Sequence, residues 1–133
     1  PTPVPSPHLQ ELNLSKNSIG SPGSHHLADV LRVNSSLRVL QLQWNTISQR
    51  GAVNLCEAVA EAACPLRTLD LSWNSLGQAA MYALGASLQG NTSLQSINLS
   101  STGMQARAAF VIAVSLSFNE NVNNIVCMDN PIG

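Results

Sequence analysis

The side chains in this sequence that are best suited to catalysis or metal binding are three cysteines, three histidines and seven acidic residues. Cys56, Cys64 and Cys127 lack the spacing of metal ligands, and their odd number argues against a disulfide framework. His25 and His26 are adjacent, and neighbouring residues on a helix point about 100° apart, so the pair cannot easily share a metal ion. We therefore expect no metal site.

Catalytic signatures are also absent from the sequence. It contains no glycine-rich phosphate loop, no nucleophile elbow, no zinc-protease helix motif and no paired-cysteine motif. Its acidic residues are scattered along the chain, so no pair is expected to work together as acid and base. The sequence thus predicts a protein that is not an enzyme and that binds no cofactor.

Composition narrows the choice of partners. The 133 residues suffice for one domain, only 10% of them are charged, and the net charge is −1, so nothing would neutralise a run of phosphates. No apolar run approaches the length of a membrane span, and the first eight residues, PTPVPSPH, do not resemble a signal peptide. We expect a protein partner, no nucleic acid, no membrane, and an intracellular, cytoplasmic, reducing location.

The positions of the remaining side chains follow from an internal repeat. Aligning the chain on LxxLxLxxNxI gives five frames, which begin at Leu9, Leu37, Leu66, Leu94 and Val122, with a period of 28 or 29 residues. In order, the frames are LQELNLSKNSIG, LRVLQLQWNTIS, LRTLDLSWNSLG, LQSINLSSTGMQ and VNNIVCMDNPIG.

Each frame except the last, which is only begun, is followed by apolar residues at helical spacing, for example Leu27, Val30 and Leu31. Gly23 and Gly51 are expected to lie ahead of two of these helices. Asparagines follow three of them, at Asn34, Asn91 and Asn119. Each repeat is therefore predicted to be a short strand, a turn, a helix and a return loop.

One such unit cannot bury its inner face alone, so the repeats must stack side by side. Strands are about 4.8 Å apart and helices 8–10 Å apart, which predicts an α/β solenoid with a concave parallel sheet and helices on its convex side. We expect a lead-in at 1–8 and about 4.5 repeats over 9–133, as part of a longer array. Their ranges are 9–36, 37–65, 66–93, 94–121 and a partial 122–133.

These frames resemble the ribonuclease-inhibitor class of leucine-rich repeats over residues 9–133. Stretches such as VNSSLRVLQLQWNTIS and GNTSLQSINL resemble the repeats of nucleotide-binding leucine-rich-repeat receptors. Similar stretches occur in actin-regulating and ciliary members, so the subfamily stays open. The resemblance implies that the ninth residue of each frame points inward and bonds the backbone of its own turn and of the next repeat. These residues are Asn17, Asn45, Asn74 and Asn130. Thr102 replaces asparagine in frame four and should weaken this ladder.

Trp44 and Trp73 share the eighth position of adjacent frames and should lie side by side where the sheet meets the turns. They either cover the asparagine turns or anchor a partner, and the two roles are compatible. The third, fifth and seventh positions should face outward from the sheet. The candidate contact residues there are Gln41, Gln43, Asp70, Ser72 and Asn98.

A second candidate surface lies on the helix of frame four, at positions that the first frame fills with outward residues such as His25 and Asp29. Its members are Phe110, Val111, Val114 and Phe118. Either this face packs against something outside these 133 residues, which we favour, or the helix is rotated.

The leading functional hypothesis is a non-catalytic scaffold that binds a partner protein through the concave face or the rim. A second hypothesis is a sensing or regulatory segment of a larger nucleotide-binding receptor. A third is a GTPase-activating repeat protein, since some arrays of this class stimulate a small GTPase. It would require a poised group of polar residues on one rim. Arg38 and Arg67 occupy the second position of their frames and have no obvious partner in the sequence. A GTP-hydrolysis assay tests it.

Overall fold

The computed structural model describes residues 8–61 and 65–133, so the lead-in and Cys64 lie outside the described residues. Strands and helices alternate along the described chain, as the repeat predicts. They are β1 (Glu11–Asn13), α1 (Gly20–Val33), β2 (Val39–Gln41), α2 (Gln49–Glu61), β3 (Thr68–Asp70), α3 (Gln78–Gly90), β4 (Ser96–Asn98), α4 (Ala106–Leu116) and β5 (Asn124–Val126).

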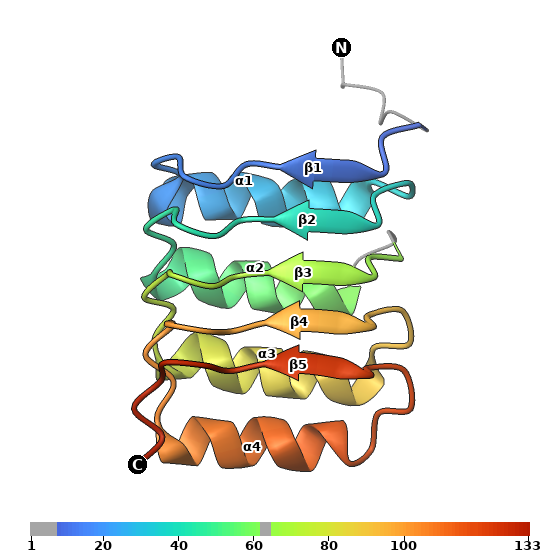
Figure 1. Cartoon of the computed structure of the whole chain (residues 1–133). Helices are drawn as coiled ribbons and strands as arrows, with labels where there is room; N and C mark the ends of the chain where they lie inside the picture. The colour runs from blue at the N-terminus through green and yellow to red at the C-terminus, as the bar shows by residue number, and fades with distance from the viewer. Residues whose placement is uncertain (1–7, 62–64) are drawn as a thin grey trace.

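The strands form one parallel sheet in chain order, and the helices are layered behind one face of it (Figure 1). Each strand pairs with the next so that residues at equal positions of the frame are opposite one another. The fourth position of each frame forms one such row: Leu12, Leu40, Leu69, Ile97 and Ile125. The predicted leucine-rich-repeat solenoid is confirmed. We call the sheet face opposite the helices the open sheet face.

The core lies between the sheet and the helices and runs continuously through the repeats. Side chains alternate across a strand, so the fourth and sixth positions of a frame point to the same side, toward the helices. In frames two and three these are Leu40, Leu42, Leu69 and Leu71, all at most 1% exposed. Burying leucines this completely is worth about 2 kcal/mol each in transfer free energy.

The asparagines after the helices close the return loops. Asn91 Oδ1 accepts hydrogen bonds from the backbone N–H groups of Ser93 and Leu94, at 2.9 and 2.7 Å, and Asn34 and Asn119 do the same in their own loops. Each side chain thus satisfies two backbone donors where the chain turns from a helix into the next strand.

The prediction that Gly23 and Gly51 lie ahead of helices is wrong, because α1 begins at Gly20 and α2 at Gln49. A Cβ at Gly51 would lie 2.3 Å from the carbonyl oxygen of Ser21. This glycine is therefore required by the close approach of the chain at Ser21 and not by a turn.

Among the described residues, no helix is both long enough and apolar enough to cross a membrane.

Candidate functional site

The turns after the strands are held by the asparagines at the ninth position. Asn74 Nδ2 donates to the carbonyl oxygens of Leu71 and Leu42, both at 3.0 Å, and its Oδ1 accepts from the N–H groups of Asn45 and Ile47, both at 3.0 Å. Leu42, Asn45 and Ile47 belong to the preceding repeat, so the expectation that these side chains bond the next repeat is wrong in direction. One side chain thereby fixes two adjacent turns.

Asn45 and Asn130 form the same kind of bonds, to Leu14 and to Leu99 in the repeats before them, both at 2.8 Å. Asn17, in the first described frame, donates within its own turn, to the carbonyl oxygen of Leu14 at 2.8 Å. Thr102 differs, because its hydroxyl donates to Leu99 O in its own repeat at 2.7 Å and forms no bond to frame three within the described residues.

The eighth position of each frame has a left-handed backbone, which sequence reasoning missed. The φ angles lie between 53° and 60° at Lys16, Trp44, Trp73, Ser101 and Asp129. This conformation costs a non-glycine residue roughly 1–2 kcal/mol. Backbone bonds to the next repeat offset the cost, for example from Trp44 N to Ser72 O at 3.2 Å and from Trp73 N to Ser100 O at 3.0 Å. Nothing in the residue types signals it, since none of the five is glycine.

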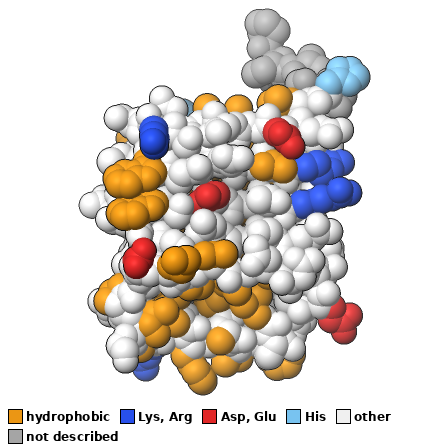
Figure 2. All heavy atoms as spheres, viewed as in Figure 1, with side chains coloured by type: hydrophobic (Ala, Val, Ile, Leu, Met, Phe, Trp, Pro, Cys, Tyr) orange, Lys and Arg blue, Asp and Glu red, His pale blue; other side chains and the backbone are white. Residues whose placement is uncertain are grey.

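Because these turns repeat in register, the two tryptophans meet. The ring centroids of Trp44 and Trp73 are 4.4 Å apart, the ring planes are 9° from parallel, and each residue is 48% exposed. We call this pair the tryptophan rim. It lies just beyond the carboxyl ends of β2 and β3, where Figure 2 shows hydrophobic side chains at the edge of the open sheet face. The pair is thus half covered and half available for contact.

Among the polar candidates, Gln41, Asp70 and Asn98 are opposite one another on β2, β3 and β4. Asp70 Oδ1 accepts from the backbone N–H of Ser72 at 2.9 Å and from its hydroxyl at 2.6 Å. Ser72 lies on the same side of the chain as Asp70 but is only 5% exposed, so it offers a partner little surface. Its hydroxyl group donates to Asp70 and so is not free to donate to a partner.

Gln43 lies beside the tryptophan rim and is half-buried. Its Oε1 is buried and has no hydrogen-bond partner among the described residues. A buried amide oxygen without a partner costs about 1–3 kcal/mol. Within the described residues, Gln43 is thus the one polar candidate with a buried side-chain atom that lacks a hydrogen-bond partner.

The second candidate surface, which we call the phenylalanine patch, comprises Phe110, Val111, Val114 and Phe118 on and just after α4. Phe110 and Phe118 are 70% and 69% exposed, and Val114 is also exposed. Helix α4 is not rotated, because Ala108 and Ile112 are buried like Ala80 and Leu84 at the same positions of α3.

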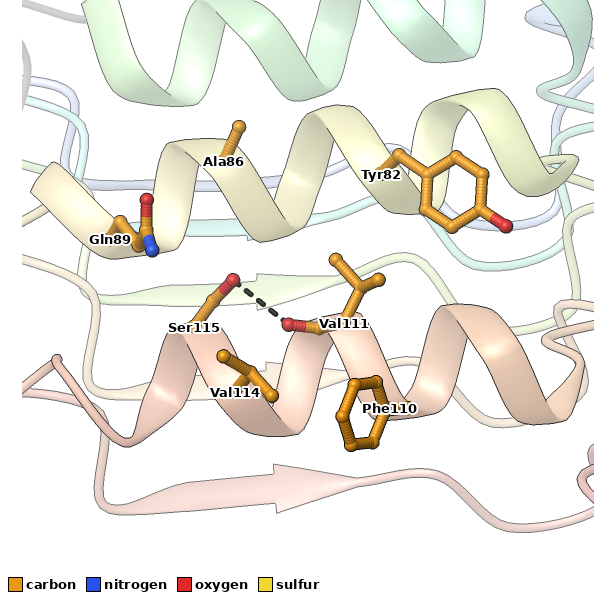
Figure 3. Close-up of a pocket in the computed structure, with 7 residues that line it drawn as sticks. All are labelled: Tyr82, Ala86, Gln89, Phe110, Val111, Val114 and Ser115. Carbon is orange, nitrogen blue, oxygen red and sulfur yellow. Dashed lines mark hydrogen bonds between the residues drawn. The ribbon is translucent and has the colours of Figure 1, made fainter.

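Part of this patch borders a groove between α3 and α4 with a volume of about 290 Å³ (Figure 3). Tyr82, Ala86 and Gln89 line it from α3, and Phe110, Val111, Val114 and Ser115 from α4. Gly85 lets α3 and α4 approach each other, because a Cβ there would lie 3.1 Å from Val111 Cγ1.

The titratable residues lie apart. Burial raises the pKa of the Cys56 thiol to about 12, and Glu57 acts in the same direction. Cys127 is half-buried, because no described strand covers the far side of β5, and burial raises its pKa as well. His25 Nδ1 is 2.9 Å from Asn54 Nδ2. Within the described residues, no three His, Cys, Asp or Glu side chains are grouped to hold a metal ion.

Comparison with known proteins identifies the repeat. A family described as "Leucine Rich repeat" matches residues 6–23, 33–56 and 62–85. The chain is 33% identical over 92 residues to "NACHT, LRR and PYD domains-containing protein 12" of Mus musculus, which covers 69% of the chain but 9% of that protein. It is 32% identical over 100 residues to "Ribonuclease inhibitor" of Sus scrofa, covering 75% of the chain and 22% of the inhibitor.

Solved structures share the fold at low sequence identity. "Leiomodin-1 Actin-Binding Site 2 (ABS2)" superposes with a TM-score of 0.78 and 16% identity, covering 90% of this chain and 70% of that one. The tropomodulin C-terminal domain of Caenorhabditis elegans gives a TM-score of 0.75 and 17% identity, covering 91% and 74%. These two similarities concern the fold alone.

Proposed function

Because the chain belongs to the leucine-rich-repeat family, in its ribonuclease-inhibitor-like form, we propose that it is a non-catalytic module that binds a partner protein. The partner contacts the open sheet face and the tryptophan rim. Leucine-rich repeats are typical protein-interaction modules, which supports the general role, and the rim supports the specific surface.

The stacked, half-exposed pair of Trp44 and Trp73 is the observation that carries this proposal. Tryptophan is enriched among the residues that dominate binding energy, because it buries a large area with few rotatable bonds. Here ring stacking and the hydrogen-bonded turns already restrict both tryptophan side chains. Binding a partner would therefore cost little further side-chain entropy.

The charge distribution supports a protein as the partner. Six basic and seven acidic residues give a net charge of −1, whereas a nucleic-acid surface needs a basic excess. Gln41, Asp70 and Asn98 add hydrogen-bonding groups next to the rim, which suits the mixed polar and apolar character of protein interfaces.

The phenylalanine patch belongs to the same proposal as a second contact surface. The chain spans less than a tenth of the length of the mouse relative, and further repeats or domains of the same protein are the proposed cover for this patch. The exposure of Met128 beside β5 agrees with a further repeat there. An intracellular, reducing location completes the proposal, supported by the buried free thiol of Cys56.

A second candidate function is a sensing or regulatory segment of a larger nucleotide-binding receptor. The relatives named as NACHT, LRR and PYD domains-containing proteins favour it. The coding sequence that flanks this stretch tests it. An upstream module with a glycine-rich phosphate loop supports the receptor hypothesis, and a complete upstream region without one contradicts it.

The main proposal is tested by comparing two double variants. Proteins captured from a cell lysate by the wild-type chain should be lost with Trp44→Ala/Trp73→Ala and retained with Phe110→Ala/Phe118→Ala, which removes an equal number of exposed aromatic rings. The chain has two tryptophans, both in the rim, so a purified captured protein should also shift their fluorescence. An identical set of captured proteins for all three chains would contradict the role of the rim.

A further inference from the structure

Arg38 and Arg67 occupy the second position of the same two frames that carry the tryptophans. They precede β2 and β3, so each of these two strands has an arginine before it and a tryptophan after it. Figure 2 shows Lys and Arg side chains at one edge of the open sheet face, level with hydrophobic side chains at the opposite edge. We call the pair of Arg38 and Arg67 the arginine edge.

The two arginines lie side by side, because Arg38 O accepts hydrogen bonds from the backbone N–H groups of both Arg67 and Thr68, at 2.8 and 3.0 Å. Equivalent positions on neighbouring strands are about 4.8 Å apart. In the other frames this position holds Gln10, Gln95 and Asn123. At this position of the frame, positive charge is therefore confined to the two repeats that carry the tryptophans.

The guanidinium groups have donors to spare. Neither arginine forms an ion pair within the described residues, where both ion pairs involve Arg32. Arg38 Nη1 donates only to the backbone oxygens of Ser35 and Leu37, at 3.3 and 3.4 Å, and the Arg67 side chain forms no hydrogen bond in the described part of the chain. A guanidinium carries five N–H donors in a planar fork that matches a carboxylate.

An acidic residue lies between the arginine edge and the tryptophan rim. Asp70, on β3, bears the only charge on β2 or β3 themselves, and its Oδ1 is bonded to Ser72. Its charge disfavours a second carboxylate at mid-strand. Along these strands the surface thus offers two guanidinium groups, then one carboxylate, then an apolar stack. The arginines and tryptophans are six residues apart, or about 20 Å in extended chain.

We propose that the open sheet face binds one segment of a partner protein that lies along β2 and β3, with an acidic side chain on Arg38 and Arg67 and an apolar side chain on Trp44 and Trp73. This inference rests on the proposed function and deepens it, since it states which side chains the bound segment carries and at which end of the strands each of them lies. A segment spanning 20 Å is about six residues long if extended and about 13 if helical.

Selection from a phage-displayed library of random peptides about 16 residues long tests the charge pattern directly, since either conformation fits that length. The wild-type chain should enrich peptides with Asp or Glu at a fixed separation from an aromatic or large aliphatic residue. The Arg38→Glu/Arg67→Glu variant should instead enrich Lys or Arg at the same separation, with the apolar residue unchanged. Arg50→Glu/Arg107→Glu changes the net charge equally elsewhere and should retain the acidic preference.

An enriched peptide is then synthesised and its affinity is measured. Arg38→Ala/Arg67→Ala should weaken its binding about tenfold, which is about 1.4 kcal/mol. The loss should shrink as salt rises, because screening weakens the exposed ion pairs in the wild type.

Three outcomes would overturn the inference. The first is enrichment on the wild type without an acidic preference. The second is an acidic preference that survives Arg38→Glu/Arg67→Glu. The third is the enrichment of peptides that contain no apolar residue and that inorganic phosphate displaces from the chain. That result would mean that the arginine edge binds phosphate. If Trp44→Ala/Trp73→Ala enriches the same peptides as the wild type, the proposed function itself has failed.

Discussion

In the second and third repeats, the exposed tryptophans lie at the rim of the open sheet face, whereas in the fourth the exposed phenylalanines lie on and just after α4. The tryptophans are fixed by left-handed turns, ring stacking and the ladder bonds of Asn45 and Asn74. Phe110 and Phe118 are more exposed and take part in no ring stack among the described residues. Exposed aromatic rings can therefore have different settings: a stacked pair on bonded turns in one region and unstacked rings on a helix face in the other.

The largest expected effect on stability separates Asn74, in the middle of the asparagine ladder, from Thr102, which interrupts it. Asn74→Ala leaves backbone groups of two turns without partners and should lower the free energy of unfolding by about 3 kcal/mol, whereas Thr102→Ala, with one bond lost, should cost about 1 kcal/mol. Urea denaturation of both variants measures the difference. Equal losses would mean that the ladder is no stronger in the middle of the array than in frame four.

A smaller effect separates the thiols of frames two and five. The folded pKa of Cys56 is about 12, above the unfolded value of about 8.5. Its contribution to stability is present below about pH 8.5 and is lost as the pH rises toward 12. Between pH 8 and 10, wild-type stability should fall by about 1 to 2 kcal/mol more than that of Cys56→Ala. Cys127→Ala should reduce this fall less, and a greater reduction would contradict the burial assigned to the two thiols.

The smallest effect concerns the aromatic surfaces. Replacing stacked Trp44 by alanine should cost roughly 0.5 to 1 kcal/mol, because a favourable ring pair is lost, while Phe118→Ala should change stability by less than about 0.5 kcal/mol. Thermal denaturation measures both. Exciton coupling between the indoles in circular dichroism, abolished by Trp73→Phe, checks the stack itself. A spectrum unchanged by that substitution would show that the rings do not stack in solution.

The leucine columns, the strand register and the place of the tryptophans could be predicted from the sequence, because one period fixes them all. Leu40 and Leu69 must be opposite each other once the repeats stack, and Trp44 and Trp73 follow from the same alignment. These features depend only on the position within the frame.

Features that depend on a neighbour in space were missed. The left-handed turn at Trp44 is supported by bonds to the next repeat, and Ser72 is buried, with its hydroxyl bonded to Asp70. Gly51 is set by the approach of Ser21, and Cys127 is partly exposed because of the place of β5 in the sheet. The sequence alone placed Arg38 and Arg67 at the second position of neighbouring frames. A binding role for them follows only once the tryptophans are known to lie beyond the same two strands.

The threonine at position 102 has a mechanical consequence. Repeat proteins open at their weakest interface, since each unit contacts only its neighbours. The seam between the third and fourth units lacks the ninth-position side-chain bond found between the other repeats, although Asn119 and Gln78 bond across it. We therefore expect the array to part there first under force or heat. The backbone amides of α4 should then exchange with deuterium sooner than those of α2. A partner bound to the tryptophan rim would stay bound while the fourth and fifth units unfold.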